Sequence, residues 1–288
     1  SFNPKYTHAY INLGIALRVQ GKLDAAINVS KKAVLIEPHN PLAYNNLGAL
    51  FTEQGKFDEA IEVYKKVILM QPNYAEAHNN LGVALRELGK VDEAIKAYKE
   101  ALTLNPNYSN AYNNLSAVLR DKGEFNAAIE ACKKAISFQS DYAEPYYNLG
   151  VLLQDQCDFK ESIKAYKKAI SLQPDYVVAY NNLGNVFKDI GNLEEAIEAY
   201  KKSILIEPDY AEAYNNLSFT LLNTGRLKEG LDKNEWRWKT SQFVSQLRHF
   251  SKPLWDGKEN LSGKTILLWS EQGIGDTLNW SSCLSHVT

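Results

Sequence analysis

The sequence predicts an all-α fold in which pairs of helices stack as repeats of 34 residues. The string Asn-Asn-Leu-Gly, or a close variant of it, returns every 34 residues without insertion or deletion. Each repeat contains two helical patterns separated by a turn residue, and a proline usually follows the second pattern. A fixed period of this length is the signature of a solenoid, in which each repeat buries its core against its neighbours.

The first half of each repeat predicts an amphipathic helix. In residues 41–74, Tyr44, Leu47 and Phe51 stand three and four positions apart, so they share one face of a helix. Gly55 follows and interrupts the pattern. Because glycine adopts backbone conformations that end a helix, we expect a turn at this position.

The second half predicts another helix, which packs against the first. Phe57, Ala60 and Tyr64 mark its buried face, and Pro72 ends the pattern. Gly48 and Ala60 are small, as expected where two helix axes approach closely. The equivalents of Gly48 are Gly14, Gly82, Ser116, Gly150, Gly184 and Ser218. The equivalents of Ala60 are Ala26, Ala94, Ala128, Ser162 and Ala196.

This pattern resembles the tetratricopeptide repeat family, and the resemblance covers about residues 1–235. It implies a right-handed superhelix of antiparallel helix pairs, in which the first helix of each pair lines the concave surface. Residues 1–6 are expected to close a preceding repeat. Seven repeats follow, the last of them degenerate and acting as a cap: 7–40, 41–74, 75–108, 109–142, 143–176, 177–210 and 211–244.

One polar residue accompanies the apolar pattern in every repeat. An asparagine precedes the buried leucine of each first helix: Asn12, Asn46, Asn80, Asn114, Asn148, Asn182 and Asn216. Asparagine costs about 0.5 kcal/mol relative to alanine in a helix, so its recurrence indicates another role. Its amide offers a donor and an acceptor, which match the backbone of an extended peptide of any sequence. Three positions later the same face is mostly apolar, with Val83, Ala117 and Val151.

The row of asparagines resembles the repeat region of protein O-linked N-acetylglucosamine transferases, where such asparagines hold substrate polypeptides. This resemblance implies a peptide-binding groove made of the row and the apolar residues beside it. A second interpretation assigns the asparagines to hydrogen bonds between repeats. The first groove position of each helix carries no cation, so a grip on a partner's terminal carboxylate is not expected. That position holds His8, Leu42, Glu76, Asn110, Glu144, Val178 and Glu212.

After the last repeat the sequence predicts a different structure. Residues 245–263 read as a linker, and residues 264–288 predict a short β-strand, a glycine loop and a helix. This string resembles the opening of heptosyltransferase-like glycosyltransferases. The resemblance implies a cofactor-binding loop at Gly273 and Gly275 and a candidate general base at Asp276. One β–α unit is not expected to be active, so a nucleotide sugar is expected as cofactor only in a longer protein.

Charge and cysteine content argue against several classes. The formal net charge is −2, which leaves no basic excess for a nucleic acid. No apolar run reaches the roughly 18–20 residues of a membrane span. Cys132, Cys157 and Cys283 are far apart and show no ligand spacing. They predict reduced thiols in a cytoplasmic protein rather than disulfides or a metal site.

We therefore expect a module that binds protein or peptide partners in its groove and recruits substrates for a larger glycosyltransferase. Two alternatives are a non-catalytic scaffold of a multiprotein complex and self-association through exposed ends of the array. The repeats contain no catalytic constellation, and whether the longer protein is an enzyme depends on the C-terminal resemblance.

Overall fold

The structure, a computed structural model, describes residues 4–240. The described part of the chain divides into two compact regions, with the boundary between Pro208 and Asp209. The predicted linker 245–263 and the predicted β–α unit 264–288 lie outside the described residues.

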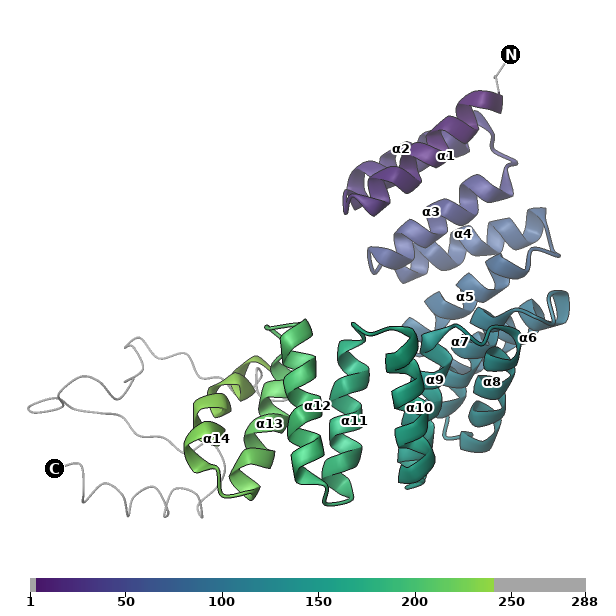
Figure 1. Cartoon of the computed structure of the whole chain (residues 1–288). Coiled ribbons are helices and arrows are strands. Elements are labelled where there is room, and N and C mark those ends of the chain that lie inside the picture. The colour runs from purple at the N-terminus through teal and green to yellow at the C-terminus, as the bar shows by residue number, and fades with distance from the viewer. Residues whose placement is uncertain (1–3, 241–288) are drawn as a thin grey trace, which may run out of the picture. The chain divides into compact units, whose positions relative to one another are not determined.

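The first region contains twelve helices arranged as six antiparallel pairs (Figure 1). The first helices of the pairs are α1 (Pro4–Val19), α3 (Pro41–Glu53), α5 (Ala75–Glu87), α7 (Ser109–Asp121), α9 (Ala143–Asp155) and α11 (Val177–Asp189). The second helices are α2 (Leu23–Ile36), α4 (Phe57–Met70), α6 (Val91–Leu104), α8 (Phe125–Phe138), α10 (Phe159–Leu172) and α12 (Leu193–Ile206).

The all-α prediction is confirmed, since the described part of the chain forms helices and no strand. Both helices predicted in residues 41–74 are present, and Gly55 lies between them with a φ of 76°. One boundary differs at the start of the chain. α1 begins at Pro4, so residues 4–6, which were assigned to a preceding repeat, belong to the first helix. Proline is tolerated there because the N–H groups of the first helical turn have no acceptor within the helix, so the N–H that proline lacks is not missed.

Small residues of the first helices contact large aromatic rings of the second helices. A Cβ atom placed on Gly48 would lie 2.6 Å from Cε1 of Tyr64, and one on Gly82 would lie 2.6 Å from Cε1 of Tyr98. Gly150 and Gly184 meet the equivalent tyrosines in the same way. These rings are almost completely buried. The predicted close approach is therefore an approach of a tyrosine ring to a glycine backbone.

Neighbouring first helices also contact one another along the array. α1 contacts α3, α3 contacts α5, α5 contacts α7, α7 contacts α9, and α9 contacts α11. Within this region no two second helices are in contact. The array therefore curves toward its first helices, which together form one continuous surface. We call this surface of α1, α3, α5, α7, α9 and α11 the inner face.

The second region begins with α13 (Ala211–Asn223) and α14 (Leu227–Asn234), followed by the 3₁₀ helix η1 (Glu235–Lys239). α14 has 8 residues, whereas α12 has 14, as expected for the degenerate last repeat. The Trp236 ring stacks on Tyr214 with a centroid distance of 4.0 Å. Leu227 and Leu231 of α14 are exposed. A capping role for this repeat stays a prediction.

Candidate functional site

The predicted asparagine row lies along the inner face. Asn80, Asn114, Asn148 and Asn182 occupy consecutive first helices and are each half-buried. Asn12 is exposed near the start of the array, and Asn216 belongs to the second region. The apolar residues Val83, Ala117 and Val151 are also half-buried on the same helices.

Each central asparagine of the row donates a hydrogen bond to the preceding repeat. The Nδ2–Oδ1 distances are 3.3 Å from Asn80 to Asn45, 3.0 Å from Asn114 to Asn79 and 2.8 Å from Asn148 to Asn113. Asn182 donates to the phenol oxygen of Tyr147 at 3.1 Å, because a tyrosine stands there in place of asparagine. The interpretation as hydrogen bonds between repeats is thus confirmed for these four side chains.

The acceptors are the first asparagines of the Asn-Asn pairs. Asn45, Asn79 and Asn113 are only 3 %, 5 % and 2 % exposed, respectively, and they lie between adjacent first helices. Asn46 shows what happens when the acceptor is missing. The residue at the acceptor position before it is Ile11, so Asn46 donates instead to the Leu42 carbonyl of its own helix at 3.0 Å.

The hydrogen bonds between repeats leave part of each amide available. An asparagine amide has two N–H groups and one carbonyl oxygen with two lone pairs. Asn114 and Asn148 each use one N–H for the preceding repeat. A second donor and the carbonyl oxygen of each remain for a partner on the inner face. The bonds between repeats also hold these amides in one orientation, which lowers the entropy cost of binding.

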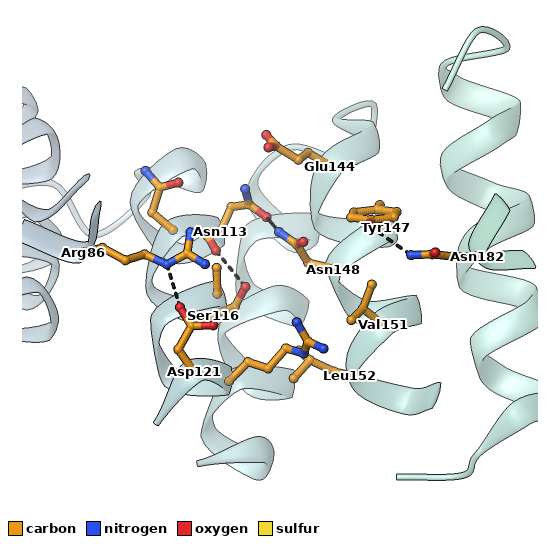
Figure 2. Close-up of a pocket in the computed structure, with 13 residues that line it drawn as sticks. Arg86, Asn113, Ser116, Asp121, Glu144, Tyr147, Asn148, Val151, Leu152 and Asn182 are labelled. Atoms are coloured by element: carbon orange, nitrogen blue, oxygen red, sulfur yellow. Dashed lines mark hydrogen bonds and ion pairs between the residues drawn. The ribbon is translucent and has the colours of Figure 1, made fainter. Parts of the chain in front are cut away.

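A pocket of about 290 Å³ opens on the inner face over α7 and α9 (Figure 2). Five of the predicted groove residues line it: Asn114, Asn148, Asn182, Ala117 and Val151. The other predicted groove residues, Asn12, Asn46, Asn80, Asn216 and Val83, do not. Ser116 and Leu152 contribute to its floor, and Tyr147 lies on one side.

One edge of the pocket consists of ion pairs between successive repeats. Arg86 of α5 donates through Nε to Asp121 at 2.8 Å (Figure 2). Arg120 of α7 holds Asp155 with two bonds of 2.6 and 3.4 Å. The hydrogen bond to Asp155 raises the pKa of Arg120 above its ordinary value. Both cations are thus neutralised by a carboxylate of the next repeat.

The opposite edge carries Glu144 and Tyr147 (Figure 2). Glu144 accepts a hydrogen bond from the Tyr142 hydroxyl and forms no ion pair within the described residues. The Tyr147 ring packs against Tyr176 with a centroid distance of 5.1 Å. Burial raises the pKa of Tyr147, so its phenol is neutral at physiological pH.

Several of these residues were not predicted as functional. Arg86 and Arg120 recur 34 residues apart, and an acidic residue follows each one 35 positions later, so the sequence does contain a signal for them. Tyr147 interrupts the row of first asparagines, which is also visible in the sequence. The absence of cations from the first groove position remains true, but it does not exclude arginines from the pocket.

Other predicted features fall into two groups. Gly273, Gly275, Asp276 and Cys283 lie outside the described residues. Within residues 4–240, no group of three or more His, Cys, Asp or Glu side chains could hold a metal ion. No helix in the same range is both long and apolar enough to cross a bilayer. Cys132 is buried and Cys157 is exposed, and both are free thiols.

Solved structures share this architecture. The chain resembles the Cut9–Hcn1 hetero-tetramer of the APC/C with a TM-score of 0.70 at 18 % identity, covering 80 % of this chain and 45 % of that one. This chain thus spans less than half the length of that relative. It resembles MamA with a TM-score of 0.51 at 31 % identity, covering 58 % of this chain and 98 % of MamA. PilF of Pseudomonas aeruginosa gives a TM-score of 0.62 at 21 % identity, with coverages of 73 % and 95 %.

No curated protein matches the chain in sequence. The profile of one family does match, over residues 5–217, and its description is the C-terminal domain of cilia and flagella-associated protein 70. The match covers the six helix pairs of the first region and continues into α13. The chain therefore belongs to this tetratricopeptide-repeat family.

Proposed function

We propose that the inner face of the first region holds an extended polypeptide segment of a protein partner. The repeat fold is that of protein-interaction scaffolds, which agrees with this role. The observation that carries the proposal is the row Asn80, Asn114, Asn148 and Asn182, held in place from repeat to repeat by hydrogen bonds. An oriented row of amides matches the alternating donors and acceptors of a peptide backbone.

The spacing of the helices sets the register of such a peptide. Packed helices lie about 8–10 Å apart, and an extended chain advances about 3.3 Å per residue. One repeat therefore corresponds to about three peptide residues, and four asparagines to a segment of roughly 9–12 residues. The partner is expected to bind through a segment that is extended or becomes extended on binding.

Alanine replacement of Asn80, Asn114 and Asn148 tests the proposal. Fluorescence anisotropy would measure the binding of labelled, unstructured dodecapeptides to wild type and variant. The matched control replaces three exposed hydroxyl residues of the second helices, one per repeat, by alanine: Thr103, Ser137 and Ser171. The affinity should fall at least about ten-fold in the first variant and stay unchanged in the control.

Unchanged affinity in the asparagine variant, with unchanged helicity in far-UV circular dichroism, contradicts the proposal. The triple variant also removes bonds between repeats, so its folding must be checked separately. Asn114→Ser offers a milder second variant, because serine keeps one polar group at the pocket. We expect this variant to bind the peptides with intermediate affinity.

The finer predictions from the sequence stay predictions. The role as recruiting region of a glycosyltransferase depends on residues 264–288, and the family match ends at residue 217. Binding of a nucleotide sugar to a protein that includes the complete C-terminal domain would test it. Self-association through the ends of the array predicts a mass that rises with concentration in light scattering. The non-catalytic scaffold and the cytoplasmic location are likewise untested.

A further inference from the structure

The pocket over α7 and α9 lies where the repeats depart from one another. Four of the six first helices in the first region carry an asparagine where α9 carries Tyr147. Ser116 replaces the glycine found at the same position of the other first helices in this region. Both residues line the pocket. Near-identical repeats contact the backbone of a bound peptide in the same way at every repeat. Selection among the peptide's side chains must therefore come from positions where the repeats differ, such as Ser116 and Tyr147.

The charges around the pocket leave one group without an opposite charge. Arg86 is paired with Asp121, and Arg120 is paired with Asp155. Glu144 is exposed, and it makes no ion pair in the part of the chain that the structure describes. Its bond from the Tyr142 hydroxyl orients the carboxylate but adds no positive charge. Of the four charged residues that line the pocket, only Glu144 has no oppositely charged partner among the described residues.

Apolar surface lies directly beside this carboxylate. Figure 2 shows the Tyr147 ring next to Glu144, with Val151 below it. A lysine or arginine side chain combines an apolar stem with a cationic head, and such side chains place the stem on apolar surface. The face of a tyrosine ring also attracts a cation. An acidic side chain would meet the uncompensated carboxylate, and an aliphatic one would leave it unpaired.

We infer that this pocket takes a basic side chain, arginine or lysine, of the polypeptide bound along the inner face. The cationic head lies at Glu144, and the stem packs on Tyr147 and Val151. This inference rests on the proposed function, since the asparagine row must first hold the backbone. It adds the class of sequence that is selected: a segment with a basic residue at one position.

The same helix position in other repeats supports a single subsite. Asn110 and Val178 stand there in α7 and α11, so neither adjacent first helix supplies a second carboxylate. Glu76 stands there in α5, but it accepts a hydrogen bond from Asn45 Nδ2 at 3.0 Å and does not line the pocket. Glu76 is therefore the matched control for Glu144.

The test uses four labelled dodecapeptides that share one uncharged background and carry Arg, Lys, Ala or Glu at a central position. Their affinities for the full chain are measured by anisotropy at moderate salt. For wild type, the Arg and Lys peptides should bind about five-fold more tightly than the Ala peptide, and the Glu peptide more weakly than Ala. Glu144→Gln should remove this preference and leave the Ala peptide unchanged. Glu76→Gln should preserve it.

Tyr147→Asn provides a second variant, because asparagine is the residue of the neighbouring repeats and keeps an acceptor for Asn182. This variant should bind the Arg and Lys peptides more weakly than wild type does, and its helicity should be unchanged. Equal affinity of all four peptides for wild type overturns the inference while leaving the proposed function in place. Binding of none of the peptides, or binding that survives alanine at Asn80, Asn114 and Asn148, overturns the proposed function itself.

Discussion

Replacing Gly82 by alanine places a methyl carbon 2.6 Å from Cε1 of Tyr98 and 2.8 Å from its Cδ1. Carbon atoms pack at about 3.5–4.0 Å, so the ring or the helix must move by roughly 1 Å. Tyr98 is only 1 % exposed, so its ring is enclosed by the rest of the protein. Overpacking of this kind costs about 1–3 kcal/mol, whereas alanine in place of glycine gains about 1 kcal/mol of helix propensity. The net result is a loss of up to about 2 kcal/mol.

Gly14→Ala is the matched control at the equivalent position of α1. Its new methyl group meets the Ser30 hydroxyl oxygen at 2.8 Å rather than a ring. That hydroxyl has no hydrogen-bond partner in the structure, so it can rotate away at little cost. The gain in helix propensity then dominates, and Gly14→Ala is expected to be neutral or stabilising by up to about 1 kcal/mol.

Thermal unfolding followed by circular dichroism measures both variants. A loss of 1 kcal/mol lowers Tm by about 2–4 °C in a protein of this size. The midpoint should fall for Gly82→Ala and should not fall for Gly14→Ala. Adding Tyr98→Cys tests the cause, because Ser116 is already matched by Cys132 in the following repeat. In that background Gly82→Ala should no longer destabilise. Equal losses in the two single variants would show that the contact with the Tyr98 ring does not cause the destabilisation.

The remaining predictions concern single side chains. Asn114→Ala should cost about 1–3 kcal/mol, because it leaves a buried asparagine oxygen without its donor. Asn46→Ala should cost less than about 1 kcal/mol, since Asn46 bonds only to its own helix. Denaturant titration measures both losses. Burial raises the pKa of Tyr64 from 10.0 to about 12, so the folded state holds the phenol proton more tightly than the unfolded chain. The stability that the neutral Tyr64 phenol contributes is complete below pH 10 and is lost as the pH rises toward 12. Tyr64→Phe should therefore lose less unfolding free energy than wild type between pH 10 and pH 12. In a Cys283→Ser variant, a thiol reagent should label the exposed Cys157 quickly and the buried Cys132 only on unfolding. Burial also raises the pKa of Cys132 to about 11, which keeps its thiol protonated. Equal labelling rates would contradict the burial.

The helical architecture could be predicted from the sequence because it depends on contacts that repeat. Leu47 returns in every repeat, and Tyr64 returns in four of the six repeats of the first region, since every repeat meets similar neighbours. The turn position is equally regular, and Cys157 confirms how firmly the turn is set. It adopts a φ of 59°, a left-handed conformation that glycine provides in the other turns. A backbone conformation that costs a non-glycine residue about 1–2 kcal/mol is retained there because the helices on both sides impose it.

The roles within the Asn-Asn pairs were harder to predict. The period shows that both asparagines recur, but it does not show that Asn114 reaches back to Asn79, since that contact depends on how far adjacent first helices are offset. The peptide-binding and the structural interpretations were presented as alternatives. The geometry allows both, because one N–H of the amide suffices for the bond between repeats.

The pocket could not be predicted because it depends on residues from four first helices. Arg86, Asn114, Tyr147 and Asn182 come together only when the helices stack. The arginine and aspartate series was present in the sequence at a separation of 35 residues, one more than the period. That offset marks contacts between successive first helices, and it is a useful signal in other arrays of this kind.

Paramagnetic relaxation enhancement can show whether the peptide lies along the inner face. A dodecapeptide with a central arginine and a nitroxide label at one end is added to protein whose asparagine side-chain amides are resolved by NMR. We expect distance-dependent broadening of Asn80, Asn114, Asn148 and Asn182, in an order that reverses when the label moves to the other end of the peptide. The side-chain amides of the second helices should keep their signal intensity. These helices are α2, α4, α6, α8, α10 and α12. Broadening centred on the second helices, or none with bound peptide, would contradict a binding surface on the inner face.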